Sequence, residues 1–208
     1  MALNVAFVHI PKTAGNSVMY ALKQGFGADA LFTVDPKTVA ELTIPSTAQV
    51  VLGHATLAEM RKNKQIKASN PKVFAVIRDP FERLLSLFNY NHAIGADKTT
   101  THTVEGLAKV IENAPRNRQC EFLDCDGNTA LEIAAGNYIC ALPHVESTLG
   151  AMFQSFGITP PKLHRINATT DKASLVIKAE DVPESLRQRA YEINARDHEL
   201  YQSLIDRS

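Results

Sequence analysis

Residues Val5–Val18 read VAFVHIPKTAGNSV, and this stretch decides how the rest of the chain is organised. The run Val5–Ile10 is apolar and rich in β-branched residues, which predicts a strand that Pro11 brings to an end. A short polar segment with Gly15 follows, and Ser17–Lys23 then has the composition of a helix. The sequence therefore predicts a strand, a tight turn and the N-terminus of a helix, in that order.

The turn after this strand has the features of an anion-binding site. The first backbone N–H groups of a helix have no partner inside the helix, and the helix dipole adds positive potential there. Lys12 adds a cation, and Thr13 and Ser17 add hydroxyl donors. Gly15 lets the backbone approach a bulky tetrahedral group. We expect a phosphate or sulfate here. The loop is not a Walker A motif, because its lysine precedes the glycine.

A second stretch reads VFAVIRDPFERLLSLF from residue 73 onward. Its apolar run Val73–Ile77 predicts a parallel strand that is buried on both faces. Asp79 has the residue type of a helix cap and Pro80 that of a first helical position, so a helix is expected over Phe81–Tyr90. Arg78 then follows the end of the strand directly.

A third strand is predicted within Ala48–Ala55, and a charged helix over Leu57–Asn63 follows it. His54 stands at the carboxyl end of that strand. In open α/β sheets, ligands bind in the crevice beyond the carboxyl ends of the strands. We therefore expect Lys12, His54 and Arg78 to converge on one crevice.

The stretch HIPKTAGNS at residues 9–17, together with the arginine stretch, resembles the nucleotide-binding signatures of sulfotransferases that use 3′-phosphoadenosine 5′-phosphosulfate (PAPS), especially the carbohydrate-type branch. The resemblance implies an α/β fold, with a central parallel sheet flanked by helices, of the P-loop nucleotide-kinase-like kind. It implies that PAPS is the co-substrate. It assigns the 5′-phosphosulfate to a loop formed by Pro11, Lys12, Thr13, Ala14, Gly15, Asn16 and Ser17. Asn16 stands where the family usually has threonine, and its amide can still donate a hydrogen bond.

The same resemblance assigns the 3′-phosphate to Arg78 and Ser86. The guanidinium of Arg78 is a planar fork suited to bidentate phosphate contact, and Ser86 adds a hydroxyl from the following helix. The alternative is that Arg78 only pairs with Asp79 or Glu82. By helical periodicity Arg83 points to a different face, so we leave it outside the site.

Sulfuryl transfer to a hydroxyl needs in-line placement, a base for the acceptor proton and positive charge at the leaving oxygen. The resemblance implies that Lys12 supplies the positive charge; the alternative is a solvated surface lysine. We choose His54 as the base, since imidazole titrates near neutral pH, and its alternative is a histidine that merely caps a strand. His9 is expected to pack below the loop, and Glu82 to lie on a solvated helix face.

The composition is that of an ordinary globular domain. The chain has 208 residues, of which 45% are hydrophobic and 21% charged, and it can bury a core without metal or disulfide staples. We expect one domain over residues 1–208. The formal net charge of zero argues against a large nucleic-acid footprint, so no nucleic-acid partner is expected.

No apolar run approaches the length of a membrane span, and the first residues lack the pattern of a signal peptide. We expect a soluble cytoplasmic protein without a membrane partner, similar to small bacterial members of the family that it resembles. Cys120, Cys125 and Cys140 form no Cys-x-x-Cys pair and are expected to be reduced thiols. The histidines show no metal-ligand spacing, so no metal is expected.

The remaining chain is predicted from weaker patterns. Residues 93–125 suit an acceptor-side insertion or lid, and a plain surface excursion is the alternative. Residues 124–128 are similar to a calcium loop, which we reject because Ala135 stands where the final glutamate belongs. Residues 164–171 resemble the family's late loop, which closes over the 3′-phosphate. Further helices are predicted over 35–42, 104–113, 130–140, 145–156 and 183–204.

The sequence therefore predicts a sulfotransferase that moves a sulfuryl group from PAPS to a hydroxyl of a small-molecule or glycan acceptor. One alternative is a nucleotide-dependent phosphotransferase on the same fold, against which the missing Walker A order argues. The other is a non-catalytic nucleotide-binding protein. Lys12 and His54 argue against that reading, because both groups that the chemistry needs are present.

Overall fold

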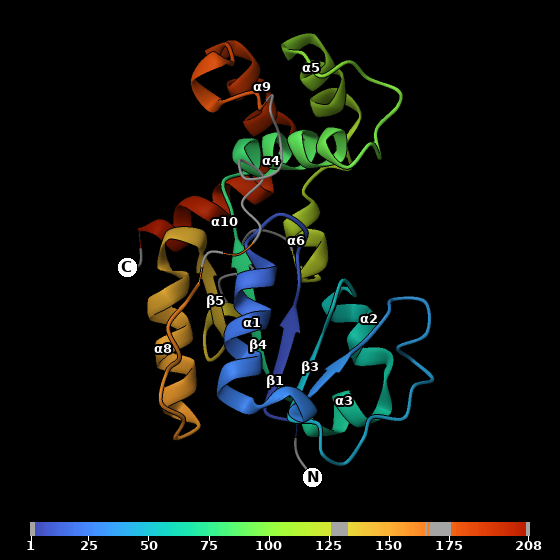
Figure 1. The fold of residues 1–208 in the computed structure, drawn as a ribbon, viewed down its shortest axis with the longest axis vertical. Coiled ribbons are helices and arrows are strands. Elements are labelled where there is room, and N and C mark those ends of the chain that lie inside the picture. The colour runs from blue at the N-terminus through green and yellow to red at the C-terminus, as the bar shows by residue number, and fades with distance from the viewer. Residues whose placement is uncertain (1–2, 126–132, 165, 167–175, 207–208) are drawn as a thin grey trace.

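A central parallel sheet organises the chain. The computed structural model describes residues 3–125, 133–164, 166 and 176–206, and Figure 1 shows the sheet flanked by helices. Its strands are β1 (Val5–Val8), β2 (Leu31–Thr33), β3 (Val50–Gly53), β4 (Lys72–Ile77) and β5 (Tyr138–Ala141). Their order is β2-β3-β1-β4-β5, and every neighbouring pair is parallel. The predicted α/β fold with a parallel sheet is confirmed.

The helices follow the strands along the chain. They are α1 (Gly15–Phe26), α2 (Leu57–Lys62), α3 (Lys64–Ser69), α4 (Pro80–Ala93), α5 (Val104–Asn113), α6 (Arg118–Phe122), α8 (Val145–Ser155), α9 (Glu184–Ile193) and α10 (Ala195–Ile205). Short 3-10 turns lie at Ala28–Ala30, Leu142–His144 and Ala179–Asp181. The helices predicted at Ser17–Lys23, Leu57–Asn63 and Phe81–Tyr90 form close to their expected bounds as α1, α2 and α4. The helix predicted at 104–113 forms as α5.

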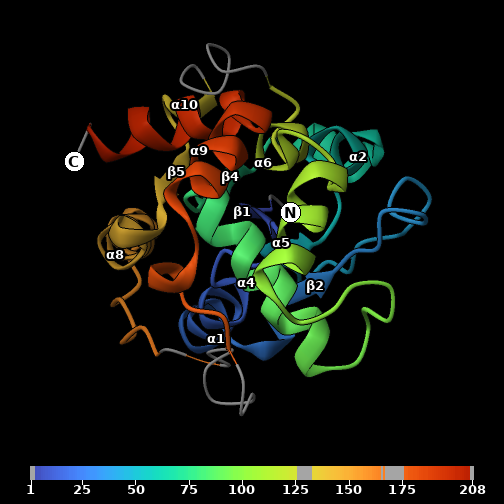
Figure 2. The same cartoon turned by 90° about the horizontal axis from the view of Figure 1, so that it is seen from above.

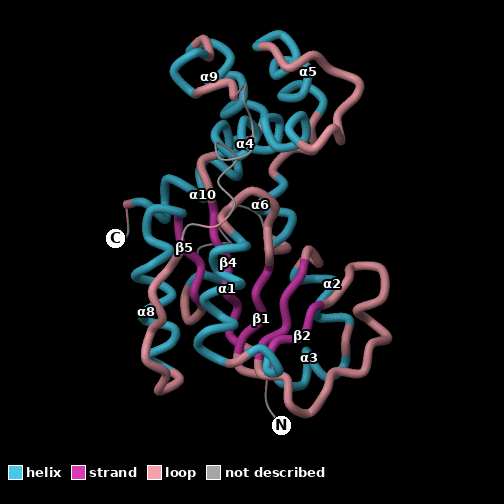
Figure 3. Tube along the Cα trace, in the orientation of Figure 1, coloured by secondary structure: helices cyan, strands magenta, loops and turns pink. Residues whose placement is uncertain are grey.

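The sheet is buried on both faces. Alternate residues of a strand point to opposite faces, so Phe7 packs with α1 and α8, and Val8 packs with α2, α3, α6 and α10. Burying a side chain of this size contributes about 1.5–3 kcal/mol. These two cores hold the strands in place from both sides (Figure 3).

A third apolar cluster lies beyond the carboxyl edge of the sheet. It joins α4, α5 and α9 through buried residues that include Phe88, Leu107 and Ile193. Figure 2, seen from above, places α4 over the strand ends with α5 and α9 beside it. Within residues 93–125, α5 therefore packs into this cluster, whereas α6 packs with α10. The acceptor-side role of this segment stays a prediction.

The helix predicted at residues 35–42 is wrong, because the chain forms successive turns there. Asp35 begins a turn as expected, since its side chain accepts from the N–H of Lys37. The side-chain amide of Asn63 then donates to the carbonyl oxygens of Val39 and Leu42, at 2.8 Å each. These hydrogen bonds satisfy two carbonyl groups of the turns from a distant part of the chain.

The helix predicted at 130–140 is wrong at its end: residues 133–134 are helical, but the chain turns after them. Residues 130–132 lie outside the described part, as do 126–128 of the rejected calcium loop. Tyr138–Ala141 forms β5, with Phe74 opposite Tyr138 and Ile77 opposite Ala141. Long-range pairing with a buried neighbour overrides the local preference.

The helix predicted at 183–204 is two helices that break at Asn194. The side chain of Asn194 accepts from the N–H of Asn117, and its φ of −113° and ψ of 43° leave the helical region. As a result, the apolar residues of the two helices pack into two different cores. Ala190 packs with α4 and α5, and Leu200 packs on the sheet.

No helix in the described ranges is both long and apolar enough to cross a bilayer. The three cysteines are free thiols, as expected, and burial raises the pKa of Cys140 to about 11. In the same described residues, no three His, Cys, Asp or Glu side chains are grouped so that they could hold a metal ion.

We predict that Asn63→Ala lowers the free energy of unfolding by about 2–4 kcal/mol, because the side chain caps α3 and donates to one buried and one part-buried carbonyl oxygen. Denaturant unfolding followed by circular dichroism measures this loss. As a control, Asp35→Ala removes an exposed turn contact and should cost less than about 1 kcal/mol. If the two variants lose the same free energy of unfolding, the stabilising role given to the Asn63 side chain is contradicted.

Candidate functional site

The carboxyl ends of β3, β1 and β4 lie side by side, so the loops that follow them meet at one edge of the sheet. The Nδ1 atom of His54 lies 2.7 Å from the carbonyl oxygen of His9. On the other side, Nη1 of Arg78 lies 3.4 Å from the carbonyl oxygen of Lys12. The structure therefore brings together the three strand ends that the sequence singled out.

The loop between β1 and α1 has an unusual backbone. Lys12 has a φ of 71°, and Ala14, the residue before the first turn of α1, has a φ of 66° and a ψ of 22°. Both are left-handed conformations that cost a side-chain-bearing residue about 1–2 kcal/mol. Strain of this kind persists only where the surrounding structure holds it, and it is common at ligand-binding sites.

Several N–H groups of this loop have no acceptor in the described part of the chain. Ser17 and Val18 donate to the carbonyl oxygen of Ala14 and begin the helix. Among the described residues, the N–H groups of residues 13–16 have no acceptor. Successive free N–H groups at a helix N-terminus form a concave anion site, so the loop fits a phosphate or sulfate oxygen.

The two hydroxyl groups of the loop have different environments. The hydroxyl of Thr13 is buried and donates to the carbonyl oxygen of Ile10 at 2.9 Å, so its proton stabilises the loop itself. The hydroxyl of Ser17 accepts from the N–H of Ile166 at 3.0 Å and keeps its own proton to donate. Ile166 belongs to the predicted late loop, whose residues 165 and 167–171 lie outside the described part.

Gly15 has a packing role that the sequence did not reveal. A Cβ atom on this residue would lie 1.7 Å from Nε2 of His9, so the imidazole occupies the space of the missing side chain. The ring of His9 also stacks on Phe7 at 5.3 Å between centroids and lies 4.2 Å from the ring of His54. The expectation that His9 packs below the loop is confirmed.

The hydrogen bond of His54 determines its tautomer. A carbonyl oxygen only accepts, so Nδ1 must carry the proton that is shared with His9. In the neutral imidazole Nε2 is then an acceptor, and it makes no hydrogen bond to the described residues. His54 is exposed, so its Nε2 lone pair is available to a substrate proton.

Burial, and to a smaller extent the charge of His54, lower the pKa of His9 to about 4. His9 is therefore neutral at pH 7. A neutral ring beside His54 adds no repulsion when His54 takes up a proton.

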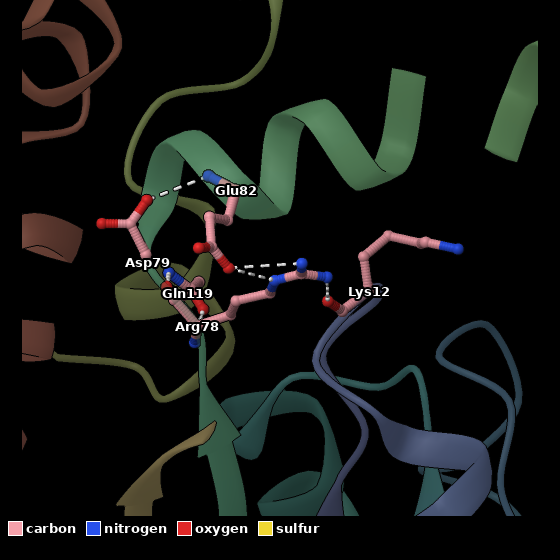
Figure 4. Close-up of polar contacts among 5 residues, drawn as sticks. All are labelled: Lys12, Arg78, Asp79, Glu82 and Gln119. Carbon is pink, nitrogen blue, oxygen red and sulfur yellow. Dashed lines mark hydrogen bonds and ion pairs between the residues drawn. The ribbon is translucent and has the colours of Figure 1, made fainter. Parts of the chain in front are cut away.

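The ammonium group of Lys12 lies over an aromatic ring. Its Nζ atom is 3.8 Å from the ring centroid of Tyr90 on α4, a cation–π contact worth about 0.5–2 kcal/mol. Figure 4 shows the side chain of Lys12 extending away from Arg78. Tyr90 was not identified from the sequence, because it is far from Lys12 along the chain and follows no motif.

The guanidinium group of Arg78 has a carboxylate partner. Its Nε and Nη2 atoms each lie 3.3 Å from Oε2 of Glu82, one helical turn into α4 (Figure 4). The alternative pairing considered from the sequence is thus present. The side chains are 25% and 52% exposed, so this ion pair contributes only about 0–1 kcal/mol.

The remaining residues of the arginine stretch follow local rules. Asp79 caps α4 by accepting from the N–H of Glu82 at 2.9 Å, and Pro80 opens the helix, as predicted. Ser86 is half-buried one turn beyond Glu82, and its hydroxyl makes no hydrogen bond to the described residues. Arg83 is buried, and burial lowers its pKa against the opposing effect of Asp197. That Arg83 takes no part in the site stays a prediction.

Comparison with known protein families gives a match to the sulfotransferase family over residues 2–130. The matched region covers more than half of the chain and contains both the β1–α1 loop and Arg78. No curated protein matches the chain.

We predict that His9 makes stability fall in weak acid. Its pKa of about 4 in the folded chain lies below the ordinary value of 6.5, so the unfolded chain binds the proton more readily. This contribution is complete above pH 6.5 and is lost as the pH falls towards 4, by about 3 kcal/mol in all. Denaturant unfolding measures the free energy of unfolding at pH 7 and at pH 4. The decrease between these two pH values should be smaller for His9→Gln than for the wild type.

The exposed His164→Gln variant is the control and should follow the wild type. If His9→Gln loses as much stability as the wild type over this pH range, the buried neutral state of His9 is contradicted.

Proposed function

Because the chain belongs to the sulfotransferase family, we propose that it transfers a sulfuryl group from PAPS to a hydroxyl of a small-molecule or glycan acceptor. The observation that carries this proposal is the meeting of two anion-binding elements at one edge of the sheet. Arg78 reaches the carbonyl oxygen of Lys12 at 3.4 Å, which sets the guanidinium beside the β1–α1 loop. PAPS has a phosphosulfate at its 5′ side and a separate phosphate at its 3′ position, and so needs two such elements.

The β1–α1 loop suits the 5′ side. The N–H groups of residues 13–16 are without acceptors in the described chain, and Ser17 can donate its hydroxyl proton. Pro11 lies in the turn that follows β1, where its fixed φ suits a tight change of chain direction. Backbone donors that are already in place stabilise negative charge without reorganisation at the moment of reaction.

Arg78 and Ser86 suit the 3′-phosphate. In the structure, the guanidinium of Arg78 is hydrogen-bonded to Glu82, so the phosphate must replace that carboxylate. The exchange is inexpensive, because the ion pair is exposed and weak. A phosphate carries more charge than a carboxylate and can accept from two nitrogens of the fork at once.

His54 is the residue suited to act as the base. As the hydroxyl oxygen of the acceptor bonds to sulfur, Nε2 of His54 accepts the hydroxyl proton, and the product nucleotide keeps the bridging oxygen with its electron pair. The bond from Nδ1 to the carbonyl oxygen of His9 holds the imidazole in this tautomer. Lys12 places positive charge near the bridging oxygen once its ammonium group leaves Tyr90.

The helices α4, α5 and α9 lie beyond this edge of the sheet (Figure 1), so an acceptor bound at the strand ends would face α4. Side chains on the lower face of α4, such as Tyr90, would then line both the donor and the acceptor positions. Closing such a site against water favours transfer to the acceptor over hydrolysis.

We predict that calorimetry detects tighter binding of 3′-phosphoadenosine 5′-phosphate than of ADP, which has as many phosphates but none at the 3′ position. Arg78→Ala should weaken binding of the 3′-phosphorylated nucleotide about ten- to a hundredfold, or about 1.5–3 kcal/mol. Arg61→Ala, an exposed arginine on α2, should change neither affinity. Equal affinities of the wild type for both nucleotides would contradict the proposed donor and favour the phosphotransferase alternative.

We predict that His54→Asn lowers kcat about a hundred- to ten-thousandfold. The asparagine amide can still donate to the carbonyl oxygen of His9, but it has no basic nitrogen in the place of Nε2. The measurement is sulfate transfer from PAPS to the hydroxyl compound that the wild type sulfates fastest in a panel of phenols, alcohols and sugars. Nucleotide affinity should stay within about twofold of the wild type. An unchanged kcat would mean that another group is the base.

A further inference from the structure

The backbone of Arg78 lies just past the end of β4, where no strand accompanies it. The pairing of β1 with β4 ends at Phe74, and that of β5 ends opposite Ile77. The N–H and C=O groups of Arg78 therefore need other partners, because an unpaired polar group in a part-buried place is costly.

The side chain of Gln119 supplies both partners. Its Oε1 atom accepts from the N–H of Arg78 at 2.9 Å, and its Nε2 atom donates to the carbonyl oxygen of Arg78 at 2.8 Å. The amide thus takes the place of a neighbouring strand for one residue (Figure 4). Since both backbone groups of Arg78 are held, the direction in which its side chain leaves the sheet is held as well.

Gln119 is itself fixed by the C-terminal helix. The N–H groups of Gln119 and Cys120 donate to the two carboxylate oxygens of Asp197 on α10, at 3.1 and 2.8 Å. Gln119 and Asp197 both have 0% exposure. Charge-assisted hydrogen bonds in a buried place are strong, so α6 cannot shift without breaking them.

Two asparagines join α6 and α10 in the same region. Asn117 donates its N–H to the side chain of Asn194 at 2.9 Å, and its own side chain accepts from the N–H of Arg196 at 3.0 Å. The helix α6 is thereby anchored to α10 at its first turn. All of α10 lies beyond residue 130, outside the region that matches the family.

We propose that Gln119, anchored by Asp197, is a positioning residue that orients Arg78 for the 3′-phosphate of the nucleotide. The inference rests on the proposed function and adds to it the residues that set the preference for a 3′-phosphorylated nucleotide. Bidentate recognition of a phosphate requires the guanidinium fork to be held within fractions of an ångström. The amide of Gln119 holds the backbone from which that fork extends.

The test is Gln119→Met, which keeps the length of the side chain but cannot hydrogen-bond to Arg78. The measured quantity is the preference ratio, the dissociation constant of ADP divided by that of 3′-phosphoadenosine 5′-phosphate, determined by calorimetry at a temperature where each variant is folded. We expect the ratio to fall about tenfold, with the affinity for ADP within about twofold of the wild type. Asp197→Asn, which weakens the anchor, should lower the ratio in the same direction.

Two comparisons separate positioning from a loss of stability. Asn63→Ala removes a buried amide from the α2–α3 junction and should keep the wild-type ratio even though it is destabilised. The double variant Arg78→Ala/Gln119→Met should have the ratio of Arg78→Ala alone, because Gln119 acts through Arg78.

A wild-type ratio retained by both Gln119→Met and Asp197→Asn would overturn the inference and leave the proposed function intact. Additive losses in the double variant would also overturn it. A wild type that binds the two nucleotides equally would instead contradict the proposed function, and the inference with it.

Discussion

Parallel pairing of β1 with a strand on each side is the constraint on which the site depends. Val5 lies opposite Val50 of β3 on one side and opposite Lys72 of β4 on the other. Because parallel strands end at the same edge, the loop that follows β1 must emerge between the residues that follow its two neighbours. His54 and Arg78 then contact the carbonyl oxygens of His9 and Lys12, so the strand order itself assembles the site.

Side-chain amides continue the backbone pairing where strands and helices end. Gln119 replaces a strand beside Arg78, Asn63 holds the carbonyls of the 35–42 turns, and Asn194 accepts the N–H that begins α6. Asp197 adds a buried carboxylate to the same network. These groups satisfy backbone donors and acceptors that secondary structure leaves unpaired. They also make the C-terminal helices part of the surroundings of the site.

Lys12 and Arg78, the two cations at this edge, each make a weak contact with a neighbouring side chain. Lys12 lies on the ring of Tyr90, and Arg78 pairs with an exposed Glu82. Contacts of this strength, about 0–2 kcal/mol, keep the cations in defined places yet yield to a phosphate, which brings more charge and more acceptors. Because His9 is neutral, it adds no positive charge to the loop. The positive potential there comes from the N-terminus of α1 and from these two cations.

The sequence by itself determined the features that depend on neighbouring residues: the strand–turn–helix around Lys12, the Asp79 cap of α4 and the bounds of α5. It also indicated which strand ends carry the candidate residues, since carboxyl edges of parallel strands coincide. Only the tertiary structure decided that 35–42 forms turns, that β5 replaces a helix and that the last helix breaks at Asn194. It alone revealed Tyr90 and Gln119 beside Lys12 and Arg78. The physical reason is the same in each case: the partner that satisfies or buries the group is distant in the chain, and no local pattern encodes it.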